Sequence, residues 1–336
     1  MQKIIIAILI FLSSTNILYS QKPVMRLADK IRIREAVKLA KVAGDDIWYR
    51  FSETPFAILL ISDSVEYLMF HPNPSGDFKL LEEDKFLNTK IYYRKQQFPS
   101  NLLATFPAVN GVSTIVVGTP EKTGKTSTEW TVTLLHEHFH QYVSSYFDYY
   151  ASVEKLDLAN GDKTGMWMLN YPFSYDKLDV VEHFYKYANL LQKSLNHFTD
   201  DDFKKSAKKT LSERKFFTEI LSRKDYNYFS FQIWQEGLAR YTEYKILTRI
   251  EVLGLTNKYK PSKEFTELKD YIAFDIYANY LFETEKENLT KYSLAIDKRV
   301  CFYSMGFAEG LLLDAVNPDW RKMYLQEKFF IEKYFE

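Results

Sequence analysis

The spacing of hydrophobic positions changes about a third of the way along the chain. Residues 25–43 carry apolar side chains at helical spacing, which predicts a helix near the N-terminus. Short, β-favourable apolar segments follow at 56–61, 65–70, 91–93, 102–106 and 112–117, separated by residues typical of turns. This part of the chain is therefore predicted to form a small sheet beside one helix.

The remaining sequence follows a helical pattern almost to its end. One helix is predicted to begin at Thr126, which forms a capping-box signature with Glu129. A loop rich in Gly, Asn, Asp and Pro covers residues 157–172, and further helices are predicted at about 175–195, 201–222, 228–250, 263–284, 299–316 and 319–334. The expected fold class is α+β, with a small mixed β-sheet N-terminal lobe, a mostly helical C-terminal lobe and a cleft between them.

The first twenty residues have the pattern of a secretory signal peptide. Lys3 precedes nine apolar residues, Ile4–Leu12, and Ser20 is a small residue at the expected cleavage point. The apolar run is shorter than the ~20 residues that span a bilayer, although an uncleaved N-terminal anchor is the alternative. The sequence thus predicts a signal peptide at 1–20, lobes at 21–150 and 151–336, no other membrane-crossing segment, and a periplasmic or secreted protein.

Composition narrows the class of protein further. The 44 basic and 44 acidic residues give no net charge, so the sequence indicates no nucleic-acid partner. Hydrophobic residues make up 46% of the chain, which is enough for a large core. The single cysteine, Cys301, rules out an internal disulfide, and its apolar neighbours are typical of an inert core position.

The segment His136-Glu137-His138-Phe139-His140 carries the strongest chemical signal, with three of the six histidines in the chain. On a helix, the first and last of these histidines lie on the same face one turn apart, where both imidazoles reach one zinc ion at about 2.0–2.1 Å. Glu137 is rotated roughly 100° from them, beside the metal rather than beneath it. The segment therefore predicts a hydrolytic zinc site with Glu137 as general base.

A catalytic zinc ion needs a third protein ligand. The extended HExxHxxGxxH pattern is excluded, because Val143 and Tyr146 stand at its glycine and ligand positions. Glu236 is the strongest candidate, since small neighbouring residues would let its helix pack close to another. The alternatives are that Glu236 is a surface carboxylate paired with Arg240, or that His183 supplies the ligand.

The segments His136–His140 and Glu236–Tyr241 together resemble the gluzincin metallopeptidases, in which a glutamate on a later helix completes the HExxH site. The resemblance implies a zincin-like two-lobe fold and zinc held by two histidines and this glutamate. Thermolysin-like members carry an acidic residue four positions after that glutamate to hold the first histidine, whereas this chain has Arg240. Glu243 is an alternative partner for the histidine, or else an exposed residue.

The expected activity is zinc-dependent hydrolysis of a peptide bond in a peptide or protein substrate. Glu137 would take a proton from a water activated by the metal and pass it to the leaving amine. Tyr303 or His183 would stabilise the oxyanion, and His138 would face away from the site. The strand at 112–117 would offer a free edge to which an extended peptide could pair.

Two other functions fit the same residues. One is a non-catalytic exported protein that binds a ligand or partner and keeps a structural or vestigial metal site. The other is a metal-dependent hydrolase of an ester or of an amide other than a peptide, because HExxH alone does not specify the substrate.

Overall fold

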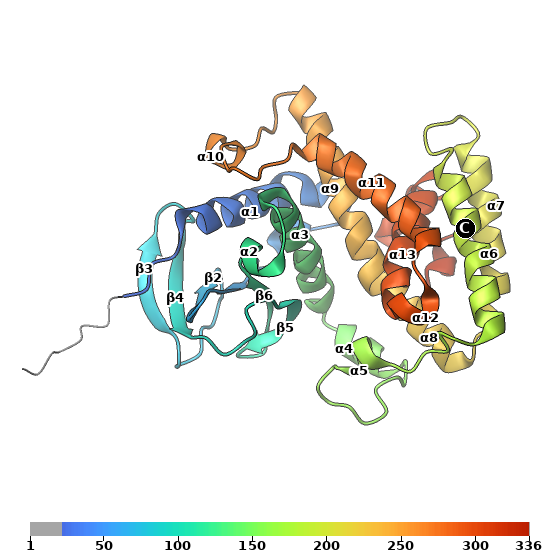
Figure 1. Cartoon of the computed structure of the whole chain (residues 1–336), viewed down its shortest axis with the longest axis horizontal. Coiled ribbons are helices and arrows are strands. Elements are labelled where there is room, and N and C mark those ends of the chain that lie inside the picture. Colours follow the sequence, from blue (N-terminus) through green and yellow to red (C-terminus); the bar gives the residue numbers. More distant parts are fainter. Residues whose placement is uncertain (1–21, 336) are drawn as a thin grey trace, which may run out of the picture.

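The computed structural model describes residues 22–335, so the predicted signal peptide at 1–20 lies outside the described residues. Figure 1 shows a β-sheet at one end of the molecule and a group of helices at the other, with α9 (Leu238–Leu255) between them. The predicted α+β class is confirmed at this level. Within residues 22–335, no helix is both long and apolar enough to cross a membrane.

The sheet has six strands in the order β3-β4-β2-β1-β6-β5. Their bounds are Ile58–Ile61 (β1), Val65–Met69 (β2), Lys79–Asp84 (β3), Thr89–Lys95 (β4), Leu103–Val109 (β5) and Val112–Gly118 (β6). Only β1 and β6 are parallel, and all other neighbours are antiparallel, so the sheet is mixed as predicted. The polar strand β3 was not predicted, because most of its side chains are exposed and it lacks an apolar pattern.

The predicted free edge was assigned to the wrong strand. β6 lies inside the sheet between β1 and β5, and the strand at this edge is β5, with β3 at the opposite edge. The apolar character of β6 is explained by this interior place, since four consecutive residues from Ile115 to Gly118 are buried. β5 carries Pro107 and an irregular register between Phe106 and Val109, both of which are typical of an edge strand.

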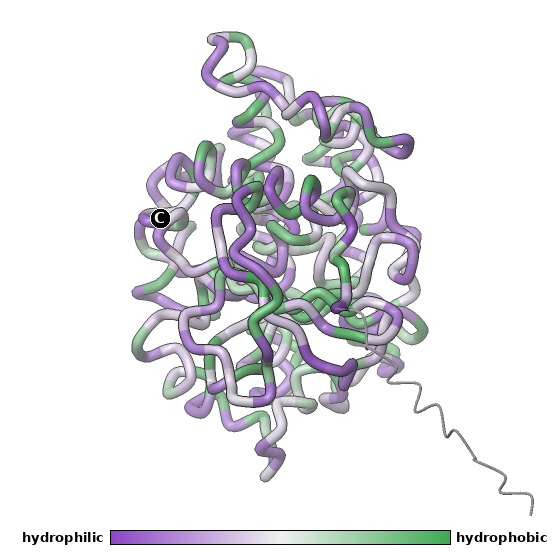
Figure 2. The backbone as a smooth tube through the Cα atoms, turned by 90° about the vertical axis from the view of Figure 1, so that its left-hand side faces the viewer, coloured by the Kyte–Doolittle hydropathy of each residue, from purple (hydrophilic) through white to green (hydrophobic). Residues whose placement is uncertain are grey.

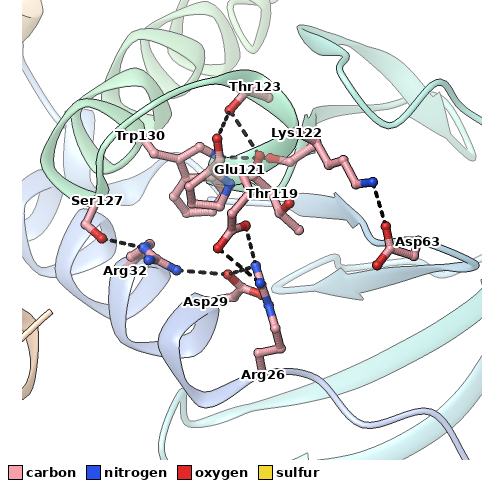
Figure 3. A network of polar contacts seen from close by, with 12 residues as sticks. Arg26, Asp29, Arg32, Asp63, Thr119, Glu121, Lys122, Thr123, Ser127 and Trp130 are labelled. Carbon is pink, nitrogen blue, oxygen red and sulfur yellow. Dashed lines mark hydrogen bonds and ion pairs between the residues drawn. The ribbon is translucent and has the colours of Figure 1, made fainter. Parts of the chain in front are cut away.

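Two helices, α1 (Leu27–Ile47) and α3 (Ser127–Ser144), cover one face of the sheet. Apolar side chains from that face join the main core, and a smaller cluster occupies the other face. Figure 3 shows how polar contacts fasten these helices together, with Arg32 of α1 bonded to Ser127 at the start of α3. Arg26 pairs with both Asp29 and Glu121 beside them.

The C-terminal part is built from helices. The longer ones are α6 (Leu178–Leu195), α7 (Phe203–Thr218), α8 (Arg223–Gln232), α9, α11 (Phe274–Lys291) and α13 (Cys301–Val316). Shorter helices of this part are α4 (Tyr149–Glu154), α5 (Trp167–Asn170), α10 (Lys263–Thr266) and α12 (Leu294–Asp297), whereas the short α2 (Pro120–Thr123) lies beside the sheet. Figure 2 shows hydrophobic stretches gathered toward the middle of the molecule, and one continuous core includes residues from both parts.

Three helix predictions were wrong in extent. The helix expected at 228–250 is interrupted by a π-helical turn, Ile233–Gly237, and the helix expected at 263–284 is broken between α10 and α11. The segment expected as a helix at 319–334 contains only short 3-10 turns, Trp320–Lys322 and Ile331–Tyr334. The buried rings of Trp320, Tyr324 and Tyr334 dock separately into the core, and this tertiary packing overrides the local helical pattern.

Candidate metal centre

Helix α3 places His136 and His140 on one face, as predicted. Its first turn is closed by the predicted capping box, in which Thr126 and Glu129 each accept a hydrogen bond from the backbone N–H of the other. The two imidazole rings lie one turn apart with their centroids separated by 4.9 Å. Both side chains are largely buried, because α3 lies between the sheet and α9.

Glu236 reaches the same point from the helical part of the chain. It lies in the π-helical turn Ile233–Gly237, where α8 passes into α9. Such turns add a residue to a helix and frequently occur at functional sites. Behind the turn, Gly237 packs directly against Gly306 of α13, and a Cβ atom on Gly237 would come within 2.4 Å of the Gly306 Cα. The glycine pair therefore permits the close helix approach that the sequence predicted.

The three side chains meet in a geometry that suits a metal ion. Nε2 of His136 and Nε2 of His140 each lie 3.4 Å from Oε2 of Glu236, and the ligand atoms all lie within 4.8 Å of one another. A charge-assisted N–H···O bond is normally shorter, at about 2.7–2.9 Å. In a tetrahedral site with metal–ligand bonds of about 2.0–2.1 Å, neighbouring ligand atoms lie about 3.4 Å apart. The residues therefore fit a metal ion, and this buried group could hold one.

His136 is oriented by Glu243, which lies two turns beyond Glu236 on α9. Nδ1 of His136 lies 2.6 Å from Oε1 of Glu243, and a proton held on Nδ1 by this bond makes Nε2 the nitrogen that would bind a metal. Glu243 is only 1% exposed, so the alternative of a surface carboxylate is excluded. Arg240 bonds both oxygens of Glu243 and does not pair with Glu236. The acidic partner of His136 is therefore Glu243, three residues after Arg240.

His140 is oriented by the side-chain amide of Gln235. The amide nitrogen of Gln235 lies 3.0 Å from Nδ1 of His140, and the hydroxyl of Tyr149 donates to the amide oxygen over 3.1 Å. When Nδ1 of His140 carries the proton, the amide turns over, so that its oxygen accepts from Nδ1 and its nitrogen donates to Tyr149. Because a tyrosine hydroxyl both donates and accepts, the network stays satisfied when Nε2 of His140 is a metal ligand.

Charges around the centre favour a cation. Burial would lower the pKa of His136, but hydrogen bonds to Glu236 and Glu243 outweigh it and raise that pKa to about 9. Burial opposes ionisation of Glu236, yet the charge of His140 and the bond to His136 hold the Glu236 pKa well below its usual range. Carboxylates that stabilise charged imidazoles in the absence of metal will also stabilise a divalent ion in their place.

The side chain of Glu137 reaches the edge strand β5. Its carboxylate Oε2 accepts a hydrogen bond of 2.7 Å from the hydroxyl of Thr105 on β5. Glu137 is 6% exposed, and its negative charge contributes to the raised pKa of His136, so the carboxylate lies close to the imidazole. The edge strand therefore fixes the orientation of the predicted general base.

Tyr303 lies on α13, beside His136. The rings of the two residues are 6.3 Å apart, and the hydroxyl of Tyr303 accepts a hydrogen bond of 2.5 Å from Nη1 of Arg299. Burial and the nearby Glu236 carboxylate raise the pKa of Tyr303 well above its usual value. Tyr303 therefore keeps its proton, and since Arg299 can only donate, the hydroxyl of Tyr303 acts as a donor on the side of the Glu236 carboxylate.

The other two predicted histidines do not join the centre. His138 faces away, as expected, and stacks on Phe56 with ring centroids 4.1 Å apart. Burial lowers the pKa of His138 to about 4, so it is a neutral core residue. His183 lies on α6, where Nδ1 contacts the backbone carbonyl of Asp179, and it does not belong to the ligand group. His183 as a third ligand was therefore not supported.

Sequence reasoning missed three residues that contact a predicted site residue. These are Thr105, Gln235 and Arg299. Gln235 could have been found, because it directly precedes Glu236 in the chain. Thr105 and Arg299 carried no local signal, because their positions follow from the packing of β5 and α13 against α3 and the π-helical turn.

Comparisons of the chain with known protein families, curated proteins and solved structures yield no match.

Proposed function

We propose that this protein is a zinc-dependent peptidase with a gluzincin-like site in a zincin-like two-lobe fold. The observation that carries the proposal is the meeting of His136, His140 and Glu236 at tetrahedral spacing, with Glu137 beside them. Two imidazole nitrogens and one carboxylate oxygen are a donor set typical of catalytic zinc. A zinc ion held there would supply a Lewis acid and lower the pKa of water toward neutrality.

Glu137 would act as the general base and then as the general acid. Its carboxylate is held by Thr105 and is close to the metal position, so it can accept a proton from the attacking water. The same carboxylate would deliver the proton to the leaving amine. The bond from Thr105 uses one oxygen of Glu137, which leaves the other free for this transfer.

Tyr303 would stabilise the negative charge that develops on the scissile carbonyl oxygen. Its hydroxyl accepts from Arg299 and retains its own proton, so it can donate to that oxygen. The neighbouring guanidinium strengthens this donor, because a positive charge makes the phenol a better hydrogen-bond donor.

An extended peptide is the substrate shape that the surroundings favour. β5 is an edge strand, and its residue Thr105 contacts the carboxylate of Glu137. A peptide paired with the outer side of β5 would therefore run past the proposed base. Strand pairing uses backbone groups, which a peptide supplies and a simple ester does not.

A catalytic role is favoured over a structural metal site by the number of ligands. In the described part of the chain, the group contains three donors and no fourth His, Cys, Asp or Glu joins it. Structural zinc sites are usually closed by four protein ligands, whereas catalytic sites keep one position open. If the pattern at residues 1–20 directs export, the peptide or protein substrate is met in the periplasm or outside the cell.

The deciding experiment combines zinc analysis with cleavage of a degenerate peptide library. We expect about one zinc per chain and cleavage that chelators abolish. Glu137→Gln should keep the zinc and lower kcat by about 10²- to 10⁴-fold, since it removes the proton acceptor. Glu236→Ala should lose zinc, and His183→Ala serves as the control with zinc and activity unchanged.

Two results would contradict the proposal. One is protein that takes up no zinc under conditions where it is folded. The other is cleavage of peptides by the Glu137→Gln protein at the rate of the unaltered protein. Zinc binding without cleavage of any peptide, ester or amide would favour the non-catalytic alternative.

A further inference from the structure

Arg299 lies at the entrance to α13, one helical turn before Tyr303. The position of α13 is set by the contact between Gly306 and Gly237, which leaves no room for a side chain at either residue. This contact holds Arg299 and Tyr303 on the side of the π-helical turn that carries Glu236. Arg299 is therefore part of the wall beside the metal centre, and its place follows from backbone packing.

The guanidinium of Arg299 has no acidic partner. Among residues 22–335, no carboxylate oxygen lies within 4.0 Å of it, and its one side-chain hydrogen bond goes to the hydroxyl of Tyr303. By contrast, the buried Arg214 of the helical part bonds both Glu309 and Glu332. An arginine has five N–H donors, so most donors of Arg299 remain open to a ligand.

Arg299 nevertheless remains charged. It is partly buried, and burial would lower its pKa, but Tyr303 and the Glu236 carboxylate act in the opposite direction and raise it. The guanidinium lies near the metal ligands, because Arg299 bonds Tyr303 and the ring of Tyr303 is 6.3 Å from that of His136. A partly buried cation with free donors is suited to binding an anion, and the planar guanidinium fork matches a carboxylate.

We propose that Arg299 binds a carboxylate of the substrate and so selects peptides that carry a free carboxylate close to the scissile bond. The inference rests on the proposed peptidase function. A peptide can supply this carboxylate in two ways, either from its C-terminus or from the side chain of an Asp or Glu residue. The hydroxyl of Tyr303 links this carboxylate position to the oxyanion position, because Arg299 and Tyr303 are bonded to each other.

The kinetic test uses matched peptides and one substitution. Each peptide is made with a free C-terminus or a carboxamide, and with a glutamate or glutamine next to the cleaved bond. For unaltered protein, we expect KM to be at least about tenfold lower for the favoured carboxylate, as removing a buried charge partner costs that much or more. Arg299→Gln should abolish this preference by raising KM for the carboxylate peptides alone, and the exposed Arg223→Gln is the charge-matched control.

The pattern of effects separates specificity from positioning. If Arg299→Gln lowers kcat equally on carboxylate and amide peptides without changing KM, Arg299 acts only through Tyr303 and the proposal is wrong. Equal KM values for all four peptides with unaltered protein would overturn it too. A preference for the free C-terminus over the carboxamide identifies the C-terminal carboxylate as the group bound. A preference for glutamate over glutamine identifies the side-chain carboxylate.

A binding measurement keeps this inference separate from the proposed function. Calorimetry with Glu137→Gln protein loaded with zinc measures the affinity of the same four peptides without turnover. We expect the carboxylate peptides to bind at least about tenfold more tightly than their amides, and this difference to vanish in the Glu137→Gln, Arg299→Gln double variant. If no peptide is cleaved but this difference in affinity is found, the peptidase proposal fails and the carboxylate site stands. If peptides are cleaved but the affinities do not differ, the peptidase proposal stands and the carboxylate site is wrong.

Discussion

The two histidines of the candidate centre and the proposed base, Glu137, each contact a second residue that fixes their orientation. Glu243 holds His136, Gln235 holds His140, and Thr105 holds Glu137. A side chain with a single free orientation loses little entropy when it binds an ion, so such partners raise affinity without touching the metal. The centre is therefore defined by pairs of residues as well as by the ligands themselves.

The contribution of Glu243 can be measured directly. Glu243→Gln removes the charge that stabilises the proton on Nδ1 of His136 and leaves Arg240 with one acidic partner fewer. We expect zinc affinity, measured by competition with a chromogenic chelator, to fall by about 10- to 100-fold. Glu251→Gln, at an exposed position of the same helix, is the control. Unchanged affinity in the Glu243 variant would mean that this carboxylate does not support the ligand.

At the scale of elements, the centre depends on the close contact between the π-helical turn and α13, which a side chain at the contact point would prevent. Glu236 lies in the π-helical turn, and Tyr303 lies on α13, which packs on that turn through Gly237 and Gly306. The residue inserted by the π turn changes the direction of the side chains before α9 resumes. Both elements must therefore keep their spacing if Glu236 is to reach the imidazoles of α3.

Gly306→Ala tests this spacing. The added Cβ atom would lie 2.6 Å from the Cα of Gly237 and 2.8 Å from the carbonyl oxygen of Ile233, and both are backbone atoms that cannot rotate away. We expect a loss of about 1–3 kcal/mol in the free energy of unfolding, from denaturant titration, together with weaker zinc binding.

The matched control for that substitution is Gly254→Ala on α9. Its nearest neighbour would be 3.8 Å from the new Cβ atom, which is an ordinary contact. Because alanine is favoured over glycine in helices, we expect this change to be neutral or stabilising by up to about 1 kcal/mol. Equal losses in the two variants would show that the helix contact is not the cause.

A second element-level test concerns the polar network that joins α1 to α2 (Figure 3). The hydrogen bond from Arg26 lowers the pKa of Glu121 to about 2. A carboxylate with a lowered pKa stabilises the fold above its unfolded pKa of about 4.5, and this contribution is lost as the pH falls from about 4.5 to 2.

Glu121→Gln should therefore reduce stability at neutral pH and have no effect near pH 2. The ion pair is about half exposed, so screening by solvent limits the expected loss to at most about 1 kcal/mol. Unfolding curves of both proteins at a series of pH values provide the measurement. A difference that stays constant between pH 7 and pH 2 would show that the effect is not due to ionisation of Glu121.

At the scale of the whole molecule, one core joins the sheet-bearing part to the helical part. Trp48, which follows α1, packs against Phe139 of α3 and against Trp320 and Tyr324 near the C-terminus. Its indole nitrogen also bonds Thr242 of α9. The metal ligands come from the same two parts, since the histidines lie on α3 and Glu236 lies beyond α8. Metal binding and the association of the two parts are therefore linked.

Removal of the metal should accordingly lower the stability of the whole chain. Zinc at about 100 times its dissociation constant would add about 2.7 kcal/mol to the free energy of unfolding, provided that the unfolded chain does not bind it. We expect chelation to lower Tm by several degrees in one cooperative transition, measured by scanning calorimetry. The His136→Ala, His140→Ala double variant should show no such shift, and a shift of the same size in that variant would point to a different metal site.

The sequence alone determined the features that depend on neighbouring residues. Three features follow from the spacing of residues only a few positions apart. They are the helix start at Thr126, the placing of His136 and His140 on one face, and the succession of short strands. Glu236 was found by resemblance and by its small neighbours. The tertiary structure decided the rest: that β5 is the edge strand, that Glu243 is buried, and that the segment after α13 is not helical. These outcomes depend on contacts between residues far apart in the chain, and the free energy of such packing outweighs the small local preference for helix or strand.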